Sequence, residues 1–263
     1  MPRPPRPPAL TVDVQRIVSE KLVATAEHHE RLESTNDRAK QIARQEEEPP
    51  LPLLVVANQQ SSGRGRGARS WWTGPQSLAF SLLVSLEHWT GGRARVPVTA
   101  LAAGVALVEV LAPRLAPRTV GLEWPNDVCV EGRKLAGILV EAPTANRLVI
   151  GVGVNTNSRL SDVPAELQDR IATLCDRTAT CHDHTELLVG WLQRWDHWFG
   201  CLPGQANLVA EAADRLCLQR GLHLRLRRGA EVHEGICRGI AADGALILET
   251  AEGLGKHYSG TLH

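Results

Sequence analysis

The stretch GRGRGARSW, Gly63 to Trp71, separates two apolar runs, LLVVAN at 53–58 and SLAFSLLVSL at 77–86. Both runs are typical of buried β-strands, so the stretch is a loop held between two strands. Its glycines let backbone N–H groups approach a ligand closely, and its arginines are permanent cations with forked donors that match carboxylates and phosphates. The loop therefore predicts an anion-binding site beside a sheet. A solvated segment that touches RNA is the alternative.

The composition limits the range of partners. The 263 residues include 29 Lys and Arg against 29 Asp and Glu, and 43% of them are hydrophobic. Balanced charge disfavours wholesale nucleic-acid binding, and this hydrophobic content supports one substantial core with room for a small second domain. The opening MPRPPRPPAL lacks an apolar h-region, which predicts a disordered tail over 1–9 and no secretory signal. Because no transmembrane helix is expected, we predict a cytoplasmic protein without a membrane partner.

The cysteine spacing gives no sign of a disulfide framework. Six of them are scattered without a CxxC pair and are expected to be free thiols. Cys175 together with CHDH at 181–184 suggests a metal site, but zinc spacing is missing and the segment borders a helical pattern. The sequence therefore predicts no metal site built from protein side chains.

Periodicity gives a coarse map of the chain. Helical spacing predicts helices over 10–23, from a cap at 34–36 to about 47, over 96–111 and over 185–202. The last carries Trp191, Trp195 and Trp198, which we interpret as core rather than as a ligand platform. Further strands are predicted at 147–157 and on both sides of a turn at Gly132. From about 216, alternating runs with turns at 228–229 and 243–244 predict a small β-barrel.

Three more motifs accompany the arginine loop: STN at 34–36, WPND at 124–127 and GRKLAGILVE at 132–141, followed by GVGVN at 151–155. In this order and spacing the chain resembles the biotin protein ligases, which attach biotin to a lysine of biotin-dependent carboxylases. The resemblance covers about residues 27–263, including the tail GICRGIAADGALILET.

The resemblance implies an α+β fold in two parts. A class II synthetase-like mixed sheet with packed helices is expected over 10–213, and a small Src-homology-3-like barrel over 214–263. Fewer than 30 residues precede the match, so the resemblance implies a short form without a DNA-binding domain and without a DNA partner. Pairing through exposed sheet edges leaves a homodimer open.

The implied reaction has two halves. The carboxylate of biotin attacks the α-phosphate of ATP to give biotinyl-5'-adenylate and pyrophosphate. The lysine amine of a biotin carboxyl carrier protein domain, such as the acetyl-CoA carboxylase subunit, then attacks that mixed anhydride. ATP and biotin are the substrates, and Mg²⁺ is expected with the phosphates, although no acidic cluster in the sequence identifies its ligands.

Three residues carry the chemistry by resemblance. Lys134 would contact the biotin carboxylate and the adenylate phosphate, and Arg66 would stabilise charge on the phosphate. Asp127 would orient or deprotonate the acceptor lysine. From the residues alone, a turn lysine and a simple Asn-Asp turn are the alternatives.

The resemblance assigns a larger set of residues to the binding of biotin and the adenylate. Hydroxyl and amide groups would hold the ureido ring or orient the carboxylate, Trp71 would stack near the adenine, and Gly137 would let the backbone pass beside biotin. Ser34 and Thr35 are also candidates for capping a helix. The loop is expected to be mobile without ligand and to order over the adenylate. The full set is Ser34, Thr35, Asn36, Gln60, Gly63, Arg64, Gly65, Arg66, Trp71, Lys134, Gly137 and Asn155.

Two departures from the family pattern matter. Glu123 precedes WPND where the family usually has a lysine, so either ATP binding is weakened or this side chain points outward. Gly67 and Ala68 stand where the usual loop reads GRGRxGR, so its dynamics are expected to differ. Lipoate and octanoate transferring enzymes share the catalytic fold but look unlike this chain at the loop, and a biotin-responsive repressor would add a winged helix.

Overall fold

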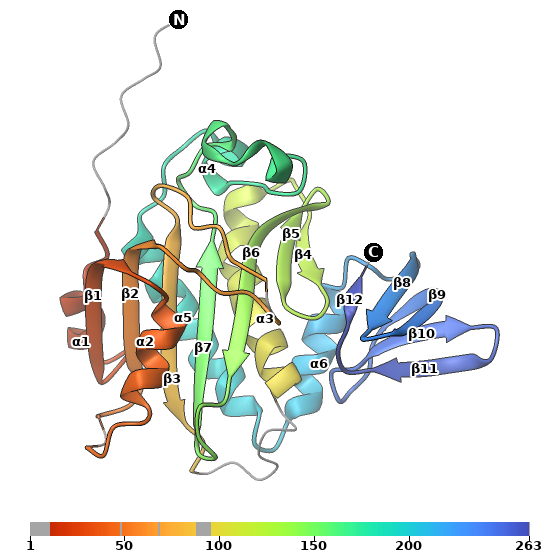
Figure 1. Ribbon diagram of the computed structural model, residues 1–263, viewed down its shortest axis with the longest axis horizontal. Helices are drawn as coiled ribbons and strands as arrows, with labels where there is room; N and C mark the ends of the chain where they lie inside the picture. Colours follow the sequence, from red (N-terminus) through yellow and green to blue (C-terminus); the bar gives the residue numbers. More distant parts are fainter. Residues whose placement is uncertain (1–10, 48, 68, 88–95, 263) are drawn as a thin grey trace, which may run out of the picture.

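A seven-stranded mixed sheet forms the centre of the molecule (Figure 1). The computed structural model describes residues 11–47, 49–67, 69–87 and 96–262. The strand order is β1-β2-β3-β7-β6-β5-β4, and only the β1–β2 pair is parallel. The neighbouring strands β2, β3 and β7 are apolar and largely buried, as their Val- and Leu-rich sequences require. The strands are β1 (Thr25–Leu32), β2 (Leu53–Gln60), β3 (Leu78–Ser85), β4 (Val120–Glu123), β5 (Asp127–Val130), β6 (Arg133–Glu141) and β7 (Arg147–Val154).

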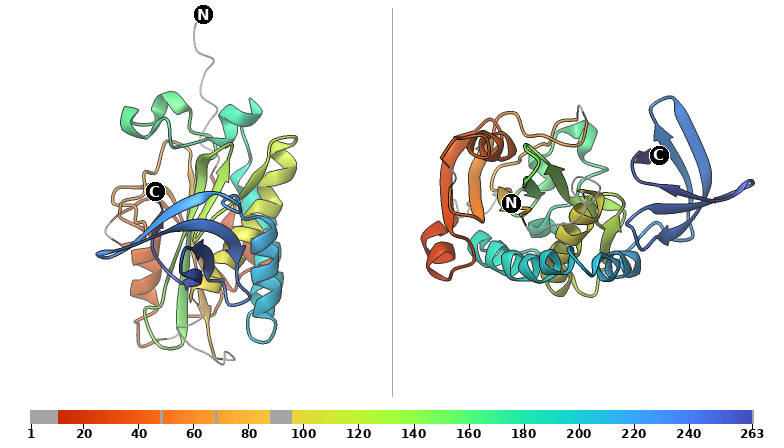
Figure 2. Two further views of the ribbon diagram at one scale, coloured as in Figure 1. Left: turned by 90° about the vertical axis from the view of Figure 1, so that its right-hand side faces the viewer. Right: turned by 90° about the horizontal axis from the view of Figure 1, so that it is seen from below.

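Helices cover both faces of this sheet, and the two faces differ. Among the described helices, the short α2 lies on one face, whereas α3, α5 and α6 pack on the other (Figures 1 and 2). The helices are α1 (Val14–Ser19), α2 (Thr35–Ile42), α3 (Val96–Leu115), α4 (Leu174–Thr178), α5 (His184–Cys201) and α6 (Ala206–Arg215).

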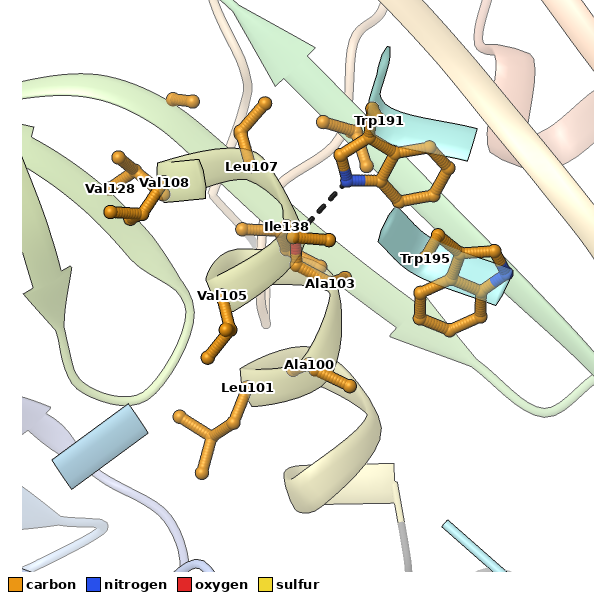
Figure 3. Packing of buried hydrophobic residues seen from close by; sticks show 14 of the residues in the cluster. Ala100, Leu101, Ala103, Val105, Leu107, Val108, Val128, Ile138, Trp191 and Trp195 are labelled. Atoms are coloured by element: carbon orange, nitrogen blue, oxygen red, sulfur yellow. Dashed lines mark hydrogen bonds between the residues drawn. The ribbon is translucent and has the colours of Figure 1, made fainter. Parts of the chain in front are cut away.

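The core lies between the sheet and α3, α5 and α6. Trp191 of α5 is fully buried and its indole N–H donates to the carbonyl of Ala103 in α3, while its ring stacks on Trp195 (Figure 3). The aromatic stripe is therefore core, as expected. Within α3, Pro97–Leu115 is long and apolar enough to cross a membrane, but 78% of its window is buried inside the protein. We conclude that α3 is the central core helix.

The end of the chain forms a second, antiparallel sheet in the order β11-β10-β9-β8-β12. The predicted turns are present, because Gly229 and Gly244 both adopt positive φ. Trp124 ties this sheet to the main one, since its indole N–H donates to the Gly244 carbonyl at 3.1 Å. The strands are β8 (His223–Arg228), β9 (Glu231–Ile240), β10 (Leu246–Thr250), β11 (Gly253–His257) and β12 (Thr261–Leu262).

Several predicted elements need correction. The helix expected at 10–23 spans only Val14–Ser19, and the one expected to reach 47 ends at Ile42. The sequence analysis missed β1, because TAEHHERL is a polar, half-exposed edge strand without clear alternation. It also missed a turn between β4 and β5, so the segment 120–141 holds three strands rather than two. The division at 213/214 stays a prediction.

The histidine of the suggested metal cluster has a different role. His184 begins α5, is 5% exposed, and its Nε2 lies 2.7 Å from Thr156 Oγ1 and 3.2 Å from Asn157 Nδ2. Within the described ranges no group of three or more His, Cys, Asp or Glu side chains could hold a metal. His184 is therefore a buried histidine that fixes the start of α5.

This burial predicts a pH dependence of stability. Burial lowers the pKa of His184 to about 4, from the ordinary histidine value of 6.5. Only the unfolded state gains the proton between these values, so this contribution is complete above pH 6.5 and is lost as the pH falls toward 4, by up to about 3 kcal/mol. We expect His184→Gln to flatten the fall in unfolding free energy over this range, as measured by urea titration. His197→Gln, at an exposed site on α5, is the control, and an unchanged slope in His184→Gln would contradict the prediction.

Candidate active site

A pocket opens on the α2 face of the sheet, beneath the arginine loop. Its lining comes from the start of α2, the loop, and strands β2, β3, β5, β6 and β7. It encloses about 110 Å³, which is less than the roughly 300 to 1,000 Å³ of typical ligand pockets. A ligand of several rings needs more room than this, so we expect the loop and its neighbours to shift when one binds. The lining residues are Ser34, Thr35, Asn36, Gln60, Arg64, Gly65, Arg66, Arg69, Ser70, Trp71, Phe80, Asn126, Asp127, Lys134, Gly137, Ile138, Leu139, Gly151, Val152 and Gly153.

The loop closes as a small hairpin over this pocket. The amide of Gly65 donates to Arg69 O and the amide of Trp71 donates to Gly63 O, both at 2.8 Å. Gly67 turns the hairpin with φ +66 and has open space around it, so the unusual loop sequence suits this turn. A Cβ at Gly63 would lie 2.6 Å from Trp71 O, so Gly63 shapes the base of the loop without lining the pocket. Mobility of the loop stays a prediction.

Arg66 reaches from the loop to the WPND turn. Its Nη1 donates to Asn126 Oδ1 at 3.1 Å. The side-chain amide of Asn126 donates in turn to Ile138 O at 2.8 Å, so the turn is fixed to β6. Burial and the charge of Arg69 lower the pKa of Arg66, whereas Asp127 raises it. A cation held in this partly desolvated position interacts strongly with an incoming anion.

Lys134 and Asp127, which the resemblance gave separate roles, form one ion pair. Lys134 Nζ lies 2.7 Å from Asp127 Oδ2. It also lies 5.4 Å from the ring centroid of Trp71, within the range of a cation–π contact. The other carboxylate oxygen, Asp127 Oδ1, is buried without a hydrogen-bond partner. Asp127 Oδ1 is therefore free to accept a hydrogen bond from a substrate. If the ion pair separates, Lys134 can bind a substrate anion and Asp127 can bind a substrate cation.

Glycines make room for Trp71 inside the pocket. A Cβ at Gly153 would collide with the indole ring, whereas a Cβ at Gly137 would lie 3.0 Å from the ring, which is a tight contact. The indole Nε1–H of Trp71 is buried without an acceptor, so it is available to donate a hydrogen bond to a ligand. The indole ring thus lies beside Gly137 on β6 and Gly153 on β7. By resemblance, this space next to Gly137 was expected to hold biotin. The stacking of Trp71 on adenine stays a prediction.

The floor of the pocket is a network of polar groups. Ser34 caps α2 by accepting from the Asp37 amide at 3.4 Å, so the expected capping role is present. Thr35 donates from its amide to Gln60 Oε1 at 2.8 Å. The fully buried Ser81 donates at 2.6 Å to Asn36 Oδ1 and lies 2.8 Å from Thr35 Oγ1. Together these groups present neutral donors and acceptors suited to an amide-like ring.

Asn155 does not line the pocket. It is 1% exposed, its amide nitrogen donates to Leu135 O at 2.9 Å, and its side-chain Nδ2 donates to Lys134 O at 3.3 Å. It therefore supports the strand that carries Lys134. Its Oδ1 is buried without a partner. The expected place of Asn155 near the adenylate stays a prediction.

Sequence reasoning missed the apolar lining of the pocket. These side chains belong to strands whose sequences look like uniform core, so periodicity gave no reason to separate pocket from interior. The glycine alternation in GVGV of β7 was the available signal, because small residues leave space on one face of a strand. The missed residues are Phe80, Ile138, Leu139, Gly151, Val152 and Gly153 on the strands and Ser70 in the loop, whereas Arg69 was expected as one of the anion-binding arginines.

Glu123 lies at the exposed end of β4, outside the lining of the pocket. Its Oε2 accepts from the thiol of Cys129 at 3.7 Å. We therefore expect Glu123→Lys to leave the KM for ATP within about twofold of wild type, as exposed substitutions away from a site usually have small effects. Steady-state adenylation kinetics measure this. A severalfold lower KM for ATP in the variant would mean that Glu123 does weaken nucleotide binding.

The architecture and the pocket define a class of protein, and comparison with known sequences gives the same one. The sequence profile of the Biotin/lipoate A/B protein ligase family matches residues 29–155. That of the Biotin protein ligase C terminal domain matches residues 223–261. The chain is thus a ligase of the biotin and lipoate class that carries the additional C-terminal domain.

Individual relatives narrow the class. The chain is similar to the Biotin--[acetyl-CoA-carboxylase] ligase of Mycobacterium tuberculosis, with 31% identity over 75% of this chain and 73% of that protein. It is 29% identical to the Bifunctional ligase/repressor BirA of Bacillus subtilis over 89% of this chain and 72% of that protein. The structure resembles the biotin protein ligase of Aquifex aeolicus in complex with biotin and ATP, with TM-score 0.76, 26% identity and coverage of 91% and 97%. The chain belongs to the biotin protein ligase family.

Proposed function

We propose that this protein is an ATP-dependent ligase that forms biotinyl-5'-adenylate and transfers biotin to a lysine of a biotin carboxyl carrier protein domain. One observation supports this most directly: a single pocket joins the cations Lys134 and Arg66 to a neutral polar floor built around Thr35 and Gln60. A carboxylic acid with a polar ring at its far end is the type of substrate that such a pocket suits. Membership of the family supplies the reaction.

In the first half-reaction, negative charge accumulates as a carboxylate oxygen of biotin attacks the α-phosphorus and pyrophosphate leaves. Lys134 is placed to neutralise the two anions as they meet, after releasing Asp127 from their 2.7 Å pair. We propose that Arg66, which donates to Asn126 Oδ1 in the structure, donates to the phosphoryl oxygens from the loop side when the substrates bind. Fixed cations in a site shielded from water lower such a barrier by electrostatic stabilisation.

In the second half-reaction, the acceptor lysine nitrogen attacks the acyl carbon of the adenylate and AMP leaves. The amine must lose a proton, and Asp127 is the carboxylate among the residues that line the pocket. Its unpartnered Oδ1 can accept that proton or hold the amine in line. We propose that the arriving lysine takes the place of Lys134 beside Asp127.

Mg²⁺ is expected with the phosphates of ATP. Throughout the part of the chain that the structure describes, no cluster of three or more acidic, His or Cys side chains could hold a metal. Asp127 is already paired with Lys134. These residues do not fit a protein-held Mg²⁺ site, so we propose that any ion enters with the nucleotide.

Further features support proposals about the setting of the protein. All six cysteines are free, as expected in a reducing compartment, so we propose a cytoplasmic location. The carrier domain is the proposed macromolecular partner, rather than DNA or a membrane. A homodimer formed through an edge of the seven-stranded sheet would use β1, because residues 216–218 pair along β4 at the other edge.

The test is biotin-dependent exchange of labelled pyrophosphate into ATP, with octanoate and lipoate run in parallel as competing acids. Exchange with biotin alone is the expected result. Exchange with octanoate or lipoate instead would move the protein to the lipoyl branch of its class. Absence of exchange with all three acids would reject an adenylating function.

A further inference from the structure

The first arginine of the loop is held by the protein's own carboxylates. Arg64 Nη1 donates to Asp37 Oδ1 at 2.8 Å, and Arg64 Nη2 lies 3.7 Å from Glu141 Oε1. Lys40 Nζ bridges the same two oxygens at 2.8 and 2.9 Å. Two anions and two cations, drawn from α2, the loop and β6, thus form a charge-balanced group. We call the group of Asp37, Lys40, Arg64 and Glu141 the carboxylate clamp.

The clamp is built into the floor of the pocket. Asn36 Nδ2 donates to Glu141 Oε2 at 2.9 Å, while Asn36 Oδ1 accepts from the buried Ser81 at 2.6 Å. Glu141 is therefore fixed from one side by Asn36 and from the other by Lys40. These two contacts hold the Glu141 carboxylate beside Arg64.

The two glycine-flanked arginines of the loop have different surroundings. Arg66 donates to the neutral amide of Asn126 and, among the residues that the structure describes, has no ion-pair partner. Arg64 faces two carboxylates. A phosphate would therefore meet a cation already neutralised at Arg64 but an available one at Arg66. An anion that drew Arg64 away would leave Lys40 alone between Asp37 and Glu141.

The charge state of the clamp favours its persistence. Burial opposes ionisation of Asp37, but Lys40 and Arg64 outweigh it and hold the pKa of this carboxyl below its usual range. Asp37 is thus an anion at neutral pH. Lys40 is the least exposed of the four side chains, so the group is partly shielded from solvent.

We propose that Asp37 and Glu141 are positioning residues that hold the loop closed through Arg64, and that the arginines of the loop divide the work, with Arg64 as anchor and Arg66 as anion donor. The role of Arg66 in this division rests on the proposed ligase function. The clamp itself does not depend on it, because every contact in it is between residues of this chain. This differs from the expectation by resemblance, which assigned Arg64 to the ligand.

Hydrogen exchange in the ligand-free protein tests the clamp. The amides of Gly65 and Trp71, which close the hairpin, are expected to exchange about threefold to tenfold faster in Asp37→Asn and in Glu141→Gln. Glu27→Gln is the matched control. Glu27 lies on β1 and binds Arg38 of α2, the helix that carries Asp37, at 2.8 Å, but it contacts no clamp residue. Unchanged exchange in both clamp variants would overturn the proposal.

A double-mutant cycle separates positioning from general loosening. If Asp37 acts through Arg64, Asp37→Asn adds no further exchange in an Arg64→Gln background, whereas additive effects would contradict the mechanism.

With biotin and ATP present, Asp37→Asn is expected to release biotinyl-adenylate about threefold to tenfold faster while the KM for biotin stays within twofold. Because the exchange measurement needs no activity, a failed pyrophosphate assay would reject the ligase function and leave the clamp to be judged on its own.

Discussion

Lys134→Gln is expected to lower the rate of biotinyl-adenylate formation by about 100- to 1,000-fold, the range seen when one donor to a developing anion is removed. Lys134 is the cation held between Asp127, at 2.7 Å, and the face of Trp71. Glutamine keeps a hydrogen-bond donor and removes the charge, so the variant isolates electrostatic stabilisation from shape. Single-turnover formation of labelled adenylate from biotin and ATP measures the rate directly.

The neighbouring residue provides a control for this variant. Arg133 begins the same strand but lines a different hollow, together with Arg159 and Arg177, so Arg133→Gln removes a charge without entering the active pocket. We expect that control to stay within about threefold of wild type. A Lys134→Gln enzyme that forms adenylate equally fast, with an unchanged melting temperature, would remove Lys134 from the catalytic group.

The sequence was sufficient to predict elements whose local pattern and tertiary environment agree. The buried runs that became β2, β3 and β7 read as strands because both faces are covered. The polar β1 failed this test, because an edge strand needs neither alternation nor high apolar content. The first of the two turns in 120–141, between β4 and β5, was also missed. Pro125 and Asn126 form this turn, but they belong to the WPND motif, which was interpreted as part of the active site rather than as a turn.

The candidate site shows where single-sequence reasoning ends. Motifs named Lys134 and Asp127, but only the cross-strand register of β5 and β6 brings them into one ion pair. The hydrogen bond that fixes Glu141 of the clamp comes from Asn36, 105 residues away in sequence, a distance over which no local pattern carries information. Asn155 was assigned to the adenylate by its motif, and that role stays a prediction. Its backbone and side-chain N–H groups donate to Leu135 O and Lys134 O of β6, and its carbonyl accepts from the Leu174 amide, contacts that no local pattern predicts.

Arg66→Gly is expected to release biotinyl-adenylate about 10- to 100-fold faster than wild type, the range that corresponds to loss of a charge-assisted hydrogen bond. The hairpin and its clamp at Arg64 remain, but the cation that reaches across to Asn126 is gone. The reactive anhydride would then leave the pocket before a carrier lysine arrives. We expect biotin to appear on lysines of an unrelated protein added to the reaction, as detected with streptavidin.

The choice of glycine needs a companion variant, because glycine also adds backbone freedom to a loop that already contains Gly65 and Gly67. Arg66→Ala removes the same charge with less added freedom, so equal bystander labelling by both variants would assign the effect to the guanidinium. Labelling by Arg66→Gly alone would assign it to opening of the hairpin, which hydrogen exchange at Trp71 would also register. Labelling at the wild-type level in both would mean that Lys134, paired with Asp127 on the strands, retains the adenylate without the loop.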